Sequence, residues 1–172
     1  MIKITGDGNC FYRCISFFLL GSEDFYEDIK NYIINWIDNN RSIFEDFFGD
    51  NLFKSKLELA EEEYQYIKQK NSWGCFHTIG ISCLIFNISI GVYIDNGDNR
   101  YIRYSFSENL NKNSDLMLLS YYNDSHFDLL YDINANLDNL VKNLTILNIK
   151  KPINNNKDSI YIKEINLIIT MY

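Results

Sequence analysis

The sequence places a cysteine near its start in a setting that suits nucleophilic chemistry. Cys10 follows the stretch Gly6-Asp7-Gly8-Asn9, whose glycines and asparagine tolerate the backbone conformations of a tight loop. The apolar residues after it recur with helical spacing, which predicts a helix over residues 10–20. A thiol at the first turn of a helix meets unpaired N–H groups and the positive end of the dipole, which favour the nucleophilic thiolate. Loop N–H groups around Cys10 are also placed to stabilise an oxyanion beside the sulfur.

A thiolate nucleophile needs a base, and the base needs a group that orients it. The chain has two histidines, and His126 opens the run His126-Phe127-Asp128. In a strand, side chains at positions i and i+2 point to the same face, so Asp128 can accept a hydrogen bond from His126 while Phe127 points into the core. The pattern predicts a triad of Cys10, His126 and Asp128, with His126 as the base and Asp128 as its orienting acceptor.

Two short motifs carry a resemblance to a known family. The pattern Asp-Gly-x-Cys, followed by two aromatic residues and Arg, occurs at Asp7, Gly8, Cys10, Phe11, Tyr12 and Arg13. Together with the late His126-Phe127-Asp128 run and the intervening Trp73-Gly74, it resembles the signature of the ovarian-tumour (OTU) family of cysteine proteases, which are mostly deubiquitinases. The resemblance covers about residues 4–132.

The resemblance implies a papain-like OTU fold and a thiol-dependent deubiquitinase. Such an enzyme hydrolyses isopeptide or peptide bonds after the C-terminal glycine of ubiquitin or a ubiquitin-like protein. Its expected partner is ubiquitin or polyubiquitin, bound by a monomer, and no metal or organic cofactor is implied. We expect an oxyanion-hole loop and a substrate groove, formed by Asp7, Gly8 and Asn9 and by Trp73, Gly74 and His77, respectively.

Other interpretations stay open for these residues. Cys10 also suits a small buried apolar residue at a helix start, and Asp7 also suits a carboxylate that only caps the loop. His77 is the other candidate base, and a zinc site of Cys10, Cys14, Cys75 and His77 is conceivable, although the chain has no Cys-x-x-Cys pair. At the level of function, the alternatives are a catalytically silent OTU-fold ubiquitin-binding module, or a cysteine peptidase or acyl transferase on an unrelated substrate.

Composition argues against several classes of function. The net charge of −7 and the pI of about 4.8 argue against nucleic acid as the main partner, because phosphate binding needs clustered Lys and Arg. No stretch approaches the roughly 20 apolar residues of a membrane span, and the motif follows Met1 too closely for a secretory signal. The four cysteines do not suggest a disulfide framework. We therefore expect a reducing, cytoplasmic location, or the host cytoplasm for a viral or bacterial effector.

The acidic balance leads to a hypothesis about substrate attraction. The ubiquitin tail that the family implies is basic, so acidic residues at the groove entry would attract it. The candidates are Glu23, Asp24, Asp28, Glu61-Glu62-Glu63 and Asp124. The alternative is that these charges only keep the surface solvated.

The order of predicted elements defines the fold class. Apolar periodicity predicts helices over 10–20, 23–38, 42–48, 52–70 and 75–86. Runs of β-branched and aromatic residues then predict strands over 88–94, 101–106, 116–122 and 126–131, with a hairpin turn at 95–98. Helices followed by strands indicate an α+β domain, with a small, mostly antiparallel sheet packed between helices. We place the catalytic domain at residues 1–134 and treat residues 135–172 as a C-terminal extension with a helix and a final strand.

Overall fold

The computed structural model describes residues 1–95, 100–105, 115–122 and 125–130. The predicted C-terminal extension and the Asn123-Asp124 turn lie outside these residues, so the domain boundary stays a prediction. Within the described ranges, no helix is both long and apolar enough to span a membrane.

Most helices begin and end close to the predicted residues. In the described part of the chain, the helical segments are α1 (Cys10–Leu20), η1 (Glu23–Phe25), α2 (Tyr26–Asn39), α3 (Arg41–Glu45), α4 (Lys56–Ile67) and α5 (Phe76–Phe86). Helix α1 ends because Gly21 takes a left-handed conformation with φ 71°, and its N–H donates to the Phe17 carbonyl at 2.8 Å. Helix α3 stops short of the predicted residue 48.

The prediction of a helix over 52–70 is wrong for its first residues. Helix α4 begins only after Ser55, whose hydroxyl accepts the N–H of Glu58 while the Glu58 carboxylate accepts the N–H of Ser55. This capping box fixes the helix start at that point. Before it, the Asn51 side chain accepts backbone N–H groups, an arrangement that competes with helix. Leu52 is 95% exposed and contributes nothing to an apolar stripe.

The described strands form one mixed sheet in the order β2-β1-β3-β4. They are β1 (Ser89–Asp95), β2 (Arg100–Ser105), β3 (Leu116–Tyr122) and β4 (His126–Leu130). Strands β1 and β2 pair antiparallel with Asp95 opposite Arg100, which confirms the predicted hairpin, and β3 and β4 are also antiparallel. Strands β1 and β3 run parallel. The sequence pattern predicted mostly antiparallel neighbours and did not indicate this parallel pair. It arises because β3 lies beside β1, on the side away from β2.

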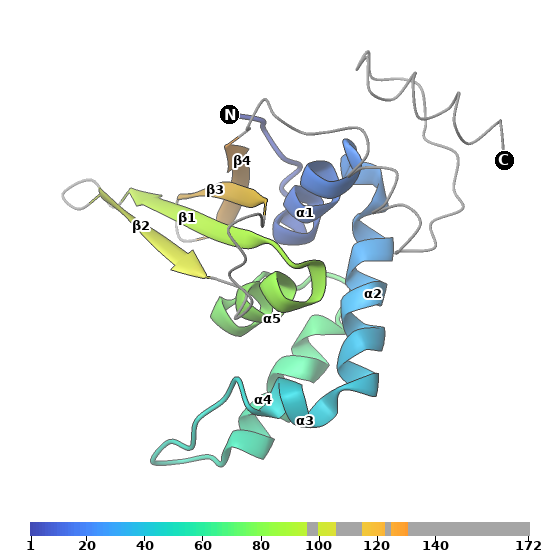
Figure 1. The fold of residues 1–172 in the computed structure, drawn as a ribbon, viewed down its shortest axis with the longest axis vertical. Helices are drawn as coiled ribbons and strands as arrows, with labels where there is room; N and C mark the ends of the chain where they lie inside the picture. Colours follow the sequence, from blue (N-terminus) through green and yellow to red (C-terminus); the bar gives the residue numbers. More distant parts are fainter. Residues whose placement is uncertain (96–99, 106–114, 123–124, 131–172) are drawn as a thin grey trace, which may run out of the picture.

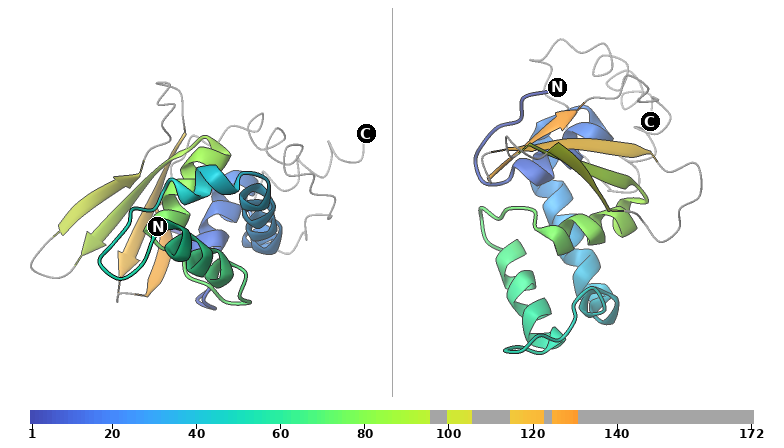
Figure 2. Two further views of the ribbon diagram at one scale, coloured as in Figure 1. Left: turned by 90° about the horizontal axis from the view of Figure 1, so that it is seen from below. Right: turned by 90° about the vertical axis from the view of Figure 1, so that its left-hand side faces the viewer.

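The helices and the sheet meet in one core, which confirms the α+β class. Helix α1 contacts β4 and α5 contacts β1 and β2, while α2 extends from α1 towards α3 and α4 (Figure 1). In the left view of Figure 2 these helices lie on one side of the sheet, so the predicted packing of the sheet between helices is not seen in the described part of the chain. The strands contribute alternate buried side chains to this core, including Ile90, Val92, Met117, Leu119, Phe127 and Leu129.

The N-terminal residues add one more pairing to the edge of the sheet. Ile2 forms an isolated antiparallel bridge with Leu129 of β4, through N–H to carbonyl distances of 2.7 and 3.2 Å. This bridge fixes the start of the chain beside β4. The following residues then lead directly into the loop before α1.

Gly74 packs against α1 so closely that a larger residue has no room. A Cβ added at Gly74 would lie 2.3 Å from Cγ of Phe11 and 2.7 Å from its Cβ, and Phe11 is fully buried. These atoms are near the backbone of Phe11, so they cannot swing away as the end of a flexible side chain does. The Trp73-Gly74 segment is thereby held against the start of the helix that carries Cys10.

We expect Gly74→Ala to destabilise the protein by about 1–3 kcal/mol, because overpacking forces the core apart. The melting temperature measured by circular dichroism should fall by several degrees. Gly49→Ala is the matched control, since a Cβ there meets nothing within 4 Å. Equal melting temperatures for the two variants would contradict the close packing of Gly74 on Phe11.

Candidate active site

The loop before α1 is shaped by a carboxylate that binds within its own turn. Asp7 accepts the backbone N–H of Asn9 at 2.9 Å and two N–H groups of Arg13, at 2.6 and 3.2 Å. The hydrogen bonds from Arg13 hold the pKa of Asp7 below its ordinary value. Gly8 takes a left-handed conformation with φ 83°, which a residue with a Cβ rarely adopts. The loop therefore has one defined shape beside Cys10.

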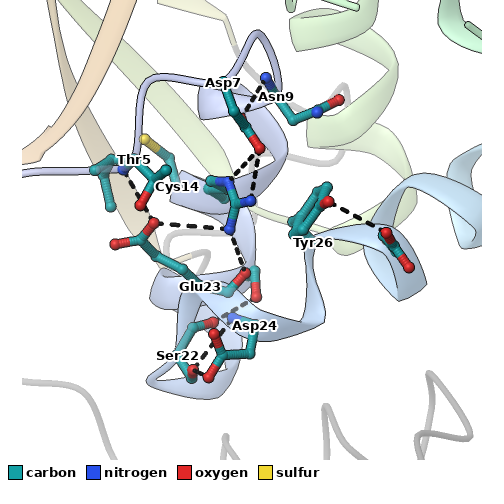
Figure 3. A network of polar contacts seen from close by, with 12 residues as sticks. Thr5, Asp7, Asn9, Cys14, Ser22, Glu23, Asp24 and Tyr26 are labelled. Atoms are coloured by element: carbon teal, nitrogen blue, oxygen red, sulfur yellow. Dashed lines mark hydrogen bonds and ion pairs between the residues drawn. The ribbon is translucent and has the colours of Figure 1, made fainter. Parts of the chain in front are cut away.

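Arg13 connects this loop to the η1 segment, because it pairs with both Asp7 and Glu23, which are labelled in Figure 3. Its guanidinium stacks 3.8 Å from the ring centre of Tyr26, and Nη1 lies 3.9 Å from the Glu23 carboxylate. Glu23 also accepts the backbone N–H of Thr5 at 3.0 Å. Glu23 is only 6% exposed, so the prediction that it is one of the acidic residues at the groove entry is wrong. Its buried carboxylate instead stabilises the loop.

A buried lysine holds the other side of the loop, and no local pattern in the sequence indicated it. Lys30 of α2 is 7% exposed, and burial lowers its pKa. Its ammonium donates to the Asn9 side chain at 3.3 Å and to the carbonyl groups of Gln69 and Lys70. The Asn9 amide also donates to the Asn71 side chain at 3.4 Å. Asn9 is thus fixed between α2 and the segment that precedes α5.

Cys10 is the first residue of α1, and its thiol faces the start of β4. The residue is 1% exposed. Burial raises the pKa of the Cys10 thiol, and the backbone N–H groups of Phe127, Phe11 and Cys10 itself oppose that rise. The helix-start donors are therefore present, but the predicted net lowering of the pKa is wrong for this structure because desolvation outweighs them.

His126 and Asp128 point to the same face of β4 and contact each other. The distance from Nε2 of His126 to Oδ1 of Asp128 is 3.1 Å. This leaves Nδ1 of the ring for another partner, and the Nδ1 edge faces Gly6: a Cβ added at Gly6 would lie 3.5 Å from Nδ1. Phe127 projects to the other face and is buried. The sulfur of Cys10 makes no hydrogen bond to His126 in the described part of the structure, although it lies beside the backbone N–H of Phe127.

Asp128 is completely buried and takes part in more interactions than the sequence pattern indicates. Oδ1 accepts the backbone N–H of Ile4 at 2.9 Å, and Oδ2 pairs with the Lys3 ammonium at 2.7 Å. Burial acts to raise the pKa of Asp128, but the hydrogen bonds from Lys3, Ile4 and His126 outweigh it and hold the pKa below its ordinary value. Neither Lys3 nor Ile4 has a local signal, because both lie more than 120 residues away along the chain.

The three groove candidates occupy different surroundings. Trp73 is 47% exposed and lies beside the loop, with Nε1 3.5 Å from the position of a Cβ on Gly8. Gly74 packs on Phe11. His77 is half-buried in α5 and stacks on Phe48 with ring centres 4.1 Å apart. Trp73 and Gly74 thus flank the start of α1, whereas His77 belongs to a separate cluster.

The four-ligand zinc set suggested by the cysteine spacing does not form. Cys14 is buried, with its sulfur 3.7 Å from the Phe127 carbonyl. Within the described ranges, Cys75 and His77 lie close to Glu63, as a group of side chains that could hold a metal ion, and not to Cys10 or Cys14. Glu63 is half-buried, so it is not part of a fully solvated acidic face.

Comparison with known proteins identifies the family. A family model described as OTU-like cysteine protease matches residues 5–127. The chain belongs to this family. The match begins just before the Asp7 loop and ends at residue 127, so it covers the whole first motif and the first two residues of the His126-Phe127-Asp128 run.

Individual relatives agree with this assignment. The chain is 26% identical over 129 residues to ovarian tumor domain-containing deubiquitinating enzyme 7 of Arabidopsis thaliana, and 25% identical over 130 residues to enzyme 9 of the same plant. These matches cover 74% and 75% of this chain but 32% and 34% of the relatives, so the chain matches about a third of their length.

Solved structures show the same fold. The OTU domain of OTUD1 superposes with a TM-score of 0.63 at 16% identity, covering 76% of this chain and 84% of that one. The OTU protease of Farallon virus gives 0.58 at 18% identity, covering 78% and 84%. The Hazara virus OTU, solved bound to ubiquitin, gives 0.54 at 18% identity, covering 76% and 81%.

The depressed pKa of Asp128 predicts an acid-dependent loss of stability. A carboxylate whose pKa is lower in the folded chain stabilises it above the unfolded pKa of about 3.9, and this contribution disappears as pH falls through the folded value. Asp128→Asn should therefore be less stable than the native chain near pH 6, and the difference should shrink below about pH 4.

Urea unfolding at pH 6 and pH 3 measures this difference. Asp46→Asn provides the control, because the Asp46 side chain is 73% exposed and its ion pair with Lys56 lies on the surface. A stability difference between the native chain and Asp128→Asn that is the same at both pH values would rule out an ionised, stabilising Asp128.

Proposed function

We propose that this chain is a thiol-dependent deubiquitinase that cleaves the bond after the C-terminal glycine of ubiquitin or a ubiquitin-like protein. The observation that carries the proposal is the convergence of two distant motifs. The Cys10 thiol at the start of α1 lies beside the backbone of β4, and the same strand presents His126 hydrogen-bonded to Asp128. The ubiquitin-bound Hazara virus OTU and the plant deubiquitinases supply the substrate class.

The residues have distinct roles in this reaction. His126 takes the proton of the Cys10 thiol through Nδ1, while Nε2 keeps its hydrogen bond to Asp128. The thiolate adds to the scissile carbonyl, and N–H groups of the Asp7 loop and the start of α1 stabilise the oxyanion. His126 then returns the proton to the leaving amine, which departs and leaves a thioester. Water, deprotonated by His126, hydrolyses the thioester and restores the thiol.

A second candidate function is a ubiquitin-binding module without catalysis. The buried Cys10 with its raised pKa, and the lack of a Cys10–His126 hydrogen bond among the described residues, favour it. Against it, the His126–Asp128 pair and the shaped loop are maintained by several buried interactions. For an active enzyme, substrate binding has to bring His126 and Cys10 together, since catalytic hydrogen bonds often tighten only in the complex.

The cellular setting that we propose is reducing and cytoplasmic. All four cysteines are free, and Cys10 needs its thiol for the reaction. We further propose that the chain acts as a monomer on ubiquitin or polyubiquitin, without a nucleic-acid or membrane partner.

A ubiquitin probe with a C-terminal electrophile should be captured covalently by the native chain. Cys10→Ala should abolish capture, and it should retain the fold because a small side chain replaces another at a helix start. Cys75→Ser is the control, because it removes the half-buried thiol outside the candidate active site, and it should retain capture. Binding of the probe without capture would establish the silent module, and neither binding nor capture would point to an unrelated substrate.

Replacement of the two histidines should separate the base from the bystander. His126→Ala should lower kcat/KM on a ubiquitin substrate by about 10²–10⁴-fold, the usual contribution of general acid–base catalysis. His77→Ala should have a far smaller effect, since His77 stacks on Phe48 in a separate cluster. Asp128→Ala should fall between them, because the base remains but loses its orientation. The opposite ranking of the histidines would show that β4 does not supply the base.

A further inference from the structure

Outside the candidate active site, three side chains that commonly bind metals converge where α4 approaches the start of α5. Glu63 lies in α4, Cys75 precedes the first residue of α5, and His77 lies in the first turn of that helix. The ligand atoms of the three lie within 4.8 Å of one another. The Cys75 thiol donates to Oε1 of Glu63 at 2.7 Å and lies 3.9 Å from Nδ1 of His77.

We propose that Glu63, Cys75 and His77 form a site for one Zn²⁺ ion, with water as the fourth ligand. Thiolate sulfur, imidazole nitrogen and carboxylate oxygen are the usual ligands of zinc, whereas magnesium and calcium prefer oxygen alone. In a tetrahedral zinc site these atoms are roughly 3.3–3.6 Å apart, so movements on the order of 1 Å complete the geometry. One thiolate and one carboxylate balance the charge of the ion.

Surrounding contacts already orient these ligands. The Thr78 hydroxyl donates to the same Glu63 oxygen at 2.7 Å, and the His77 ring stacks on Phe48 with the planes 21° apart. Such outer contacts hold ligands in place and raise metal affinity. All three ligands are half-buried, so an ion can reach them from solvent.

The position of the site gives it a structural consequence. Zinc would join the two ends of residues 64–74, the segment that carries Asn71, Trp73 and Gly74. Asn71 accepts a hydrogen bond from Asn9, Trp73 lies beside Gly8, and Gly74 packs on Phe11. Binding displaces the thiol proton to solvent and restrains this segment. The proposal rests on the side-chain cluster and not on the proposed function, so either can fail alone.

The test uses the full chain with Cys10→Ala, which removes the thiol of the candidate active site. Calorimetric titration with Zn²⁺ should show one equivalent bound per chain, and Zn²⁺ should raise the melting temperature because it binds the folded state. Co²⁺ should give a thiolate-to-cobalt absorption band that Cys75→Ser removes. No binding, or a band that survives in Cys75→Ser, would overturn the proposal.

Neighbouring glutamates provide a matched control. Glu63→Gln and His77→Ala should each weaken Zn²⁺ binding by about 10- to 100-fold or more. Loss of a residue that only orients a metal ligand already costs that much, and these two residues are ligands themselves. Glu62→Gln changes the adjacent charge on the same helix, where Glu62 pairs with Lys54, and should leave the affinity unchanged. Equal affinities for Glu63→Gln and Glu62→Gln would refute the site.

A measurement without ligand substitutions guards against variants that fail to fold. In the Cys10→Ala chain, Zn²⁺ should slow alkylation of Cys75, located by peptide mass spectrometry, because the metal-bound sulfur is not free to react. The buried Cys14 and Cys83 serve as internal references. An unchanged rate at Cys75 under saturating Zn²⁺ would contradict coordination by that sulfur.

Discussion

The geometry of the candidate active site depends on one buried carboxylate. Removing a charge from water costs several kcal/mol unless hydrogen bonds and an opposite charge compensate it. Asp128 receives three such partners, from the Lys3 ammonium, the Ile4 N–H and the His126 ring. Because two of them belong to the N-terminal segment, the group that orients His126 also fixes the chain that leads to the Asp7 loop. The two halves of the candidate triad are thereby positioned relative to each other by the same side chain.

The loop itself is held from two sides by cations in an acidic protein. The chain carries a net charge of −7, yet Arg13 and Lys30 approach the loop before α1. Arg13 matches its planar group to Asp7, a geometry that lysine cannot supply. Lys30 instead collects carbonyl and amide oxygens, which suits a compact ammonium with three donors. Arg13 thus binds mainly a carboxylate and Lys30 mainly uncharged oxygens, and together the two cations restrict the conformation of the loop.

Local patterns in the sequence predicted the parts of the site that depend on neighbours in the chain. The period of a strand places His126 and Asp128 on one face, and the helical period places Cys10 at the start of α1. The partners from distant segments, Lys3 and Lys30, have no such signal, since only the fold brings them close. The error in the helix predicted over 52–70 has a local cause: the Ser55 capping box starts α4 later than the apolar residues indicated. The parallel pairing of β1 and β3 also escaped prediction, because strand order depends on the whole sheet.

The electrostatics around Cys10 show why the loop carboxylate needs its arginine. The negative charge of Asp7 acts to raise the pKa of the Cys10 thiol, in the same direction as burial. An unpaired Asp7 would therefore work against the thiolate that the proposed reaction requires. Because Arg13 binds both Asp7 and the Glu23 region, it places a positive charge beside that carboxylate and reduces its field at the sulfur. The loop thus gains the shape that Asp7 provides while Arg13 offsets part of the electrostatic penalty. The largest cost of forming the thiolate is desolvation, and in the proposed reaction a substrate would overcome it by bringing His126 to the sulfur.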